Sequence, residues 1–117
     1  MALDLIETTG MFVHTIEDTV TRTIGHDIRA LANFQESMLT DIARQAALIA
    51  CAIEANQFTV KEQDFFVDGL KRMMSTFVEA LVQMVAITIK KLWNALVEAV
   101  WSTLNTIARA ALPVPIL

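Results

Sequence analysis

Apolar side chains recur every third or fourth residue through the first half of the chain, which is the spacing of one face of an α-helix. Gly25 lies inside this series, but the phase of the pattern continues past it. The pattern therefore predicts one continuous helix from about residue 11 to residue 55. The apolar positions that define this face are Val13, Ile16, Val20, Ile24, Ile28, Leu31, Phe34, Met38, Ile42, Ala46, Ile49 and Ile53.

A second helix is predicted from about residue 59 to residue 112. Thr59 is followed three residues later by Glu62, which is the spacing of a capping box. In this motif the hydroxyl and the carboxylate each accept a hydrogen bond from a backbone N–H that the helix leaves unpaired. The helix should stop before Pro113, because proline cannot extend a helix. Gly occurs three times and Pro twice, and such sparse turn residues favour long helices over a sheet.

These two helices predict an all-α fold in which residues 1–117 form a single domain. A loop of only a few residues joins the helices, so we expect a long antiparallel helical hairpin with a short N-terminal segment. The C-terminal tail "LPVPIL" should be extended, since each proline restricts both itself and its predecessor. Its apolar residues Val114, Ile116 and Leu117 should dock on the same chain or on a neighbouring copy, and we favour the neighbour.

The polar residues of the second helix form a single stripe, and nearly every position off that stripe between Leu81 and Trp101 is apolar. The first helix can cover only one side of this apolar surface, so another flank needs a different cover. The hairpin is therefore expected to pack into a helical oligomer. The stripe consists of Asp64, Asp68, Arg72, Ser75, Glu79, Gln83, Lys90, Asn94, Glu98, Ser102, Asn105 and Arg109.

The residues predicted to form the assembly surface are the apolar ones off the polar stripe, together with those of the tail. Within this set, Trp93 and Leu96 are expected to act as central anchors. The full set is Leu81, Val85, Ile89, Trp93, Leu96, Val97, Val100, Trp101, Val114, Ile116 and Leu117.

Composition and charge support association with another apolar surface. Of the 117 residues, 55% are hydrophobic and 19% are charged, and the mean hydropathy is +0.50. A small domain has little interior in which to bury so many apolar side chains. The net charge of −4 argues against nucleic-acid binding, for which a basic patch is expected. Residues 1–68 carry a net charge of −7 and residues 69–117 a net charge of +3, so the more apolar half is also the cationic half.

A membrane-spanning helix is disfavoured, because such a helix needs about 18 or more apolar residues with few charges. The two most apolar windows, Met73–Ile89 and Leu92–Ala108, each contain a glutamate, and Lys90 and Lys91 separate them. Residues 73–109 could still lie on a lipid surface, with the lysines and tryptophans at the depth of the headgroups. The N-terminus "MALDLIETTG" lacks the features of a signal peptide, so a cytoplasmic or membrane-associated location is expected.

The sequence contains no motif for catalysis, for a cofactor or for a metal. His14 and Asp18 share a helix face, but the Glu-x-x-His order of carboxylate-bridged metal sites is absent. Glu79 and Glu98 share their stripe with cationic residues, which favours a solvated face. Cys51, the single cysteine, cannot form an intrachain disulfide, and its Ala-rich surroundings favour a buried thiol.

The leading hypothesis is therefore a non-enzymatic structural protein that self-assembles into a homo-oligomer or filament through the apolar faces of its long helices. A membrane-active or lipid-surface-binding amphipathic protein, such as a pore-former or coat, is the first alternative. A small helical subunit of a hetero-complex is the second. None of the three requires a cofactor or nucleic acid.

Overall fold

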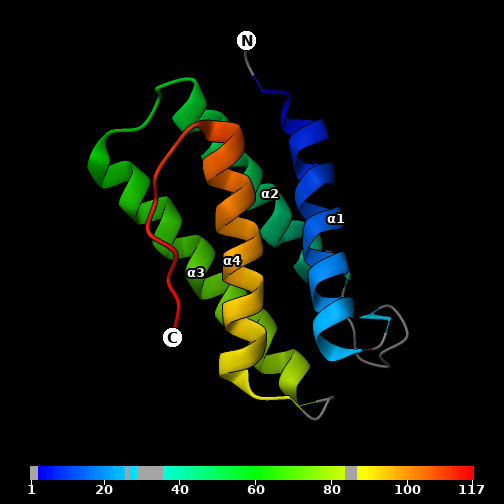
Figure 1. The fold of residues 1–117 in the computed structure, drawn as a ribbon. Coiled ribbons are helices and arrows are strands. Elements are labelled where there is room, and N and C mark those ends of the chain that lie inside the picture. The colour runs from blue at the N-terminus through cyan, green and yellow to red at the C-terminus, as the bar shows by residue number, and fades with distance from the viewer. Residues whose placement is uncertain (1–2, 26, 29–35, 84–86) are drawn as a thin grey trace.

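The computed structural model describes residues 3–25, 27–28, 36–83 and 87–117. Over these residues the chain forms helices and no strand, which confirms the predicted all-α fold. The helices are α1 (Leu5–Ile24), α2 (Glu36–Glu54), α3 (Val60–Val82) and α4 (Ile89–Ala108). They pack into a bundle of 41 × 27 × 19 Å, and the C-terminal tail runs back beside α3 and α4 (Figure 1).

The continuous helix predicted over residues 11–55 is wrong, because α1 ends at Ile24. Gly25 has φ +75°, a left-handed conformation that ends helices and that glycine adopts without a steric penalty. Its N–H donates a hydrogen bond to the carbonyl of Thr21 at 3.0 Å. The helix also begins earlier than predicted, since the Asp4 carboxylate accepts a hydrogen bond from the N–H of Ile6. The series positions Leu31 and Phe34 lie outside the described residues.

The capping box at the start of α3 is confirmed. The N–H of Thr59 donates to the Glu62 carboxylate at 3.0 Å, and the N–H of Glu62 donates to the Thr59 hydroxyl at 3.1 Å. The helix predicted over residues 59–112 is nevertheless divided into α3 and α4. The hydroxyl of Thr88 caps α4 by accepting a hydrogen bond from the N–H of Lys91 at 3.1 Å. This second cap is hard to find in the sequence, because a lysine at that position cannot complete a capping box.

Helix α2 contacts each of the other three helices, as α4 does. Its buried face is rich in alanine, and small side chains leave room for larger residues from the three helices around it. Trp101 of α4, Phe12 of α1 and Phe77 of α3 are among the largest fully buried side chains. The fully buried alanines of α2 are Ala43, Ala46, Ala47 and Ala50.

The chain breaks between α1 and α2 and again between α3 and α4. The shorter helices can therefore pack their apolar faces against one another within one chain. Leu96 and Val97, predicted as part of an assembly surface, have no exposed surface in the bundle. In the polar stripe, Glu79 and Glu98 are both exposed, as predicted for a solvated face, whereas Asn94 and Asn105 are half-buried. The hairpin geometry is therefore replaced by four shorter helices that share one core.

Leu96→Asp should unfold the bundle rather than only reduce its assembly. A carboxylate at this fully buried position would have no partner in an apolar core, and such changes cost several kcal/mol. We expect the helical circular dichroism signal at 222 nm to fall, with loss of a cooperative thermal transition. The exposed substitution Glu98→Asp on the same helix is the control. A helical Leu96→Asp variant of reduced oligomer size would instead support the original prediction of a helix-face interface.

The capping box should make part of the stability dependent on pH. The hydrogen bonds from Thr59 lower the pKa of Glu62 below its ordinary value of 4.5. The stabilisation is therefore present above the unfolded-state pKa and is lost as the pH falls through the lower, folded-state pKa. Denaturant unfolding of the wild type should lose more stability between about pH 5 and pH 3 than the same measurement on Glu62→Gln. Parallel pH profiles for the two proteins would contradict this role of Glu62.

Candidate functional site

The C-terminal tail forms an extended segment, here called the strap (residues 112–117), that lies along α4 in the antiparallel direction (Figure 1). Three side chains of α4 hold it, and we call them the strap seat: Trp93, Asn94 and Asn105. Every hydrogen bond between the seat and the strap goes to a backbone atom of the strap.

Each asparagine of the seat makes a paired contact with one end of the strap. The Asn105 amide donates to the Leu112 carbonyl at 3.0 Å and accepts from the Leu112 N–H at 2.9 Å. The Asn94 amide donates to the Leu117 carbonyl at 3.2 Å and accepts from the Leu117 N–H at 2.7 Å. Between them, the Trp93 indole N–H donates to the Pro115 carbonyl at 2.7 Å.

The spacing of the seat matches the length of the strap. Asn94 and Asn105 are eleven residues apart, about three helical turns, so they lie on one face of α4 with a rise of about 16 Å between them. Leu112 and Leu117 are five residues apart, and a chain of that length can span up to about 16 Å. The helix and the strap therefore meet in register at both ends.

The prolines of the strap suit this seat. Pro113 and Pro115 have no backbone N–H. The seat accepts hydrogen bonds only from the N–H groups of Leu112 and Leu117, so neither proline removes a bond to the seat. Proline also fixes φ near its extended value, so the strap loses less conformational entropy when it docks. The N–H of Ile116, which the seat does not bind, donates instead to the Val114 carbonyl of the strap at 2.9 Å.

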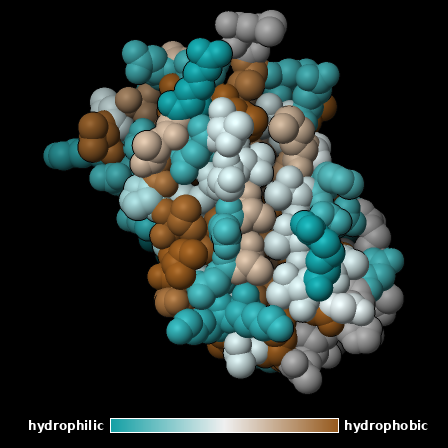
Figure 2. Space-filling view, in the orientation of Figure 1, coloured by the Kyte–Doolittle hydropathy of each residue, from teal (hydrophilic) through white to brown (hydrophobic). Residues whose placement is uncertain are grey.

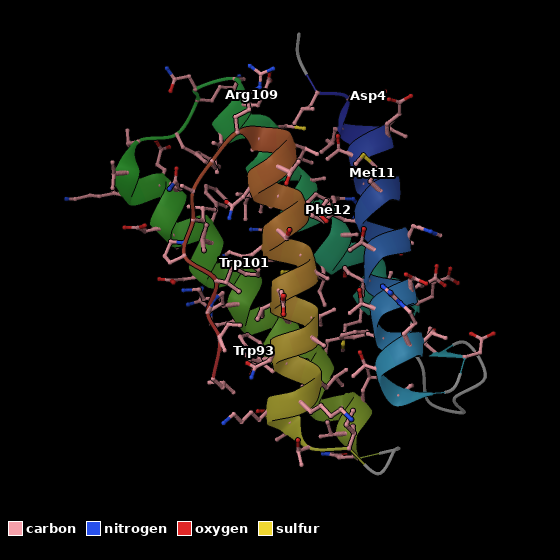
Figure 3. The ribbon with its side chains drawn as sticks, in the orientation of Figure 1. Asp4, Met11, Phe12, Trp93, Trp101 and Arg109 are labelled. Atoms are coloured by element: carbon pink, nitrogen blue, oxygen red, sulfur yellow. The ribbon has the colours of Figure 1, made fainter. Side chains whose placement is uncertain are left out.

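The two tryptophans of α4, both labelled in Figure 3, differ in their hydrogen bonding. The indole N–H of Trp93 is satisfied by the strap, whereas the buried indole N–H of Trp101 has no acceptor among the described residues. Trp101 lies beneath a pocket of about 310 Å³ between α3 and the start of the strap. The pocket is lined by Asp64, Val67, Asp68, Lys71, Trp101, Leu112 and Pro113.

The structure divides the predicted assembly residues into two groups. The side chains buried in the core of the chain are Leu81, Trp93, Leu96, Val97, Val100 and Trp101. Those with large exposed surfaces are Ile89 (47%), Val114 (37%), Ile116 (53%) and Leu117 (63%). Val85 lies outside the described residues. The buried residues could contact another molecule only if the bundle opened. The exposed residues can do so while the bundle stays folded.

The strap is docked on its own chain, whereas we had favoured a neighbouring copy. Of the three residues that hold it, Asn94 and Asn105 belong to the predicted polar stripe and Trp93 to the predicted assembly surface, and none of them was predicted to bind the strap. Asn94 and Asn105 carried a usable signal, because eleven-residue spacing puts two amides on one helix face beside a proline-rich segment. Nothing in the sequence marked Trp93 as the donor to Pro115.

His14 and Asp18 line an open pocket of about 310 Å³ together with Glu17, Thr21 and Asp27. The described residues contain no group of three or more side chains suited to hold a metal, and Asp18 pairs with Arg22 at 2.8 Å. Cys51 is partly buried rather than fully buried, and burial raises the pKa of its thiol above 9.0. In the part of the chain that the structure describes, no helix has the length and hydropathy needed to cross a bilayer.

Comparison with known protein families finds no matching family model, and comparisons with curated proteins and with solved structures find no match.

Trp93→Phe should loosen the strap, because it removes the indole donor to the Pro115 carbonyl while keeping an aromatic ring in the core. We expect lower heteronuclear NOE values for residues 114–117, with a loss of global stability of no more than about 1.5 kcal/mol. Trp101→Phe is the matched control, since its indole N–H donates to no described residue. Equal strap order in both variants and the wild type would show that the Trp93 bond does not hold the strap.

Proposed function

We propose that this protein is a non-enzymatic helical assembly protein that associates with further copies of itself through the outer surface of the strap. The single observation that carries the proposal is the arrangement of the strap. Its backbone is bound to α4 on the inner side, while Val114, Ile116 and Leu117 keep large apolar surfaces exposed. Figure 2 shows hydrophobic surface where the strap crosses this face of the molecule.

A strap held in this way is suited to bind a partner. Its hydrogen bonds to α4 fix the positions of the apolar side chains before any partner arrives, so little further ordering is needed on binding. Burying apolar surface contributes about 25 cal/mol per Å², which favours covering Ile116 and Leu117. These two side chains are more exposed than that of Val114.

Another copy of the chain is the partner that fits best. A self-complementary patch closes a two-fold dimer by pairing with itself, and a predominantly apolar patch is complementary to its own copy. Val114, Ile116 and Leu117 carry no charge that would repel the same side chains of a second strap. The hydrophobic composition of 55% is also high for a chain of 117 residues.

An anionic lipid surface is the second candidate, and one observation favours it. Lys90 and Lys91 are exposed about one turn before Asn94, the residue that binds Leu117, so cationic and apolar side chains lie near each other at this end of α4. Such a combination is typical of proteins that lie on the surface of anionic bilayers.

Ile116→Asp combined with Leu117→Asp should reduce association without unfolding the protein, because both side chains are exposed. Size-exclusion chromatography with light scattering should give a mass close to 13.0 kDa for the variant and a larger mass for the wild type at the same concentration. The control is Ile6→Asp combined with Leu48→Asp, which makes the same charge change at exposed apolar positions on α1 and α2.

Three outcomes are decisive in this experiment. A larger mass for the wild type and control, but not for the strap variant, supports self-association through the strap. A wild type that stays at 13.0 kDa at every concentration rules out the proposal. Flotation of that monomer with vesicles containing phosphatidylserine, abolished in Lys90→Glu combined with Lys91→Glu, would establish the lipid surface instead.

A further inference from the structure

The contacts between the strap and its seat do not depend on the two belonging to one chain. Trp93, Asn94 and Asn105 donate three hydrogen bonds to backbone carbonyls of the strap, and the two asparagines accept two from its backbone N–H groups. We infer that the seat also accepts the strap of a second copy, so that two chains pair by exchanging residues 112–117. This inference rests on the proposed function in that the protein associates with its own copies, but the contact here is the seat instead of the outer surface of the strap.

The segment that joins α4 to the strap favours such an exchange. Arg109 has φ 54° and ψ 44°, a left-handed conformation that is costly for a residue with a Cβ atom. Figure 3 shows Arg109 at the end of α4, where the chain reverses into the strap. The reversal is needed only when the strap docks on its own helix. A straightened connection through Ala110 and Ala111 would relieve the strain at Arg109, and short strained hinges are the segments through which proteins exchange elements.

The direction of the strap fits a closed pair of chains. On its own helix the strap runs antiparallel to α4, from Asn105 towards Asn94. A straightened strap continues in the direction of its own α4 instead, and would be antiparallel to the α4 of a copy placed with its C-terminal end facing the first. Both chains then donate one strap and accept one, which is a two-fold symmetric arrangement that closes on itself.

The strap can dock on its own chain or on a second copy, and contributions to the free energy from outside the seat decide between these two forms. The same five hydrogen bonds form in either state, so they favour neither. The intramolecular form gains from the high effective concentration of a strap tethered by a few residues. The exchanged form gains from the release of the left-handed conformation at Arg109, and its population rises with protein concentration.

Mixing two full-length variants tests the exchange directly. The first has a disabled seat and an intact strap: Trp93→Phe, Asn94→Ala and Asn105→Ala. The second has an intact seat and a disabled strap, with Leu112→Pro and Leu117→Pro removing both N–H donors. Neither variant holds a complete pair of seat and strap, but the mixture does. Native mass spectrometry should therefore detect a 1:1 heterodimer in the mixture and little dimer of either variant alone.

The outcomes separate this inference from the proposed function. A mixture that stays monomeric while the wild type associates overturns the exchange and leaves self-association through the outer surface of the strap. A heterodimer in the mixture with a monomeric wild type supports a seat open to a second copy, and overturns the proposed function. A heterodimer that persists when Leu112→Pro and Leu117→Pro are also added to the seat-disabled variant overturns the exchange, because no intact strap remains.

The hinge gives a second test that leaves the strap and the seat unchanged. Arg109→Gly permits the left-handed turn and should lower the dimer fraction below that of the wild type. Arg109→Val opposes the turn, because a β-branched residue is strained at positive φ, and should raise the dimer fraction. Circular dichroism at 222 nm is the control that checks whether both variants keep their helices. Equal dimer fractions for the two folded variants would overturn the role of the hinge in exchange.

Discussion

The need to bury a large apolar surface within a short chain is the constraint on which this structure depends. Two uninterrupted helices would each have a single neighbour and would leave one apolar flank uncovered. Four shorter helices give α2 three neighbours and α4 three neighbours, so the same side chains are covered within one molecule. The breaks at Gly25 and before Thr88 make this possible, and each is stabilised by hydrogen bonds at a helix end.

The strap extends the same principle beyond the helices. It adds apolar residues along one side of α4, and Trp93, Asn94 and Asn105 bind the backbone of Leu112, Pro115 and Leu117. A segment fixed by its backbone keeps its side chains free to meet a partner, which is why the proposed association is assigned to the strap and not to the helix faces. The backbone of the strap, which binds the seat, and the outer apolar surface of the strap thus have different physical roles.

The sequence predicted the helical class, the Thr59 capping box and the exposure of Glu79 and Glu98, because each depends on local chemistry and helical periodicity. It did not reveal where the long helices break. At Gly25 the apolar phase continued across the break, and at Thr88 the capping residue lacked the glutamate that would have marked it. The site was only partly predictable for a related reason. An extended apolar tail follows from Pro113 and Pro115, but its docking on α4 depends on tertiary contacts between residues 112–117 and two asparagines in the polar stripe.

The central claim is that the strap is bound to α4 through Trp93, and its most direct test is a nuclear Overhauser measurement on the Trp93 indole proton. The account predicts cross-peaks from this proton to the Hα protons of Pro115 and Ile116, since the indole nitrogen lies 2.7 Å from the Pro115 carbonyl oxygen. An indole proton of Trp93 that shows contacts only within the helical core, with none to residues 112–117, would contradict the account.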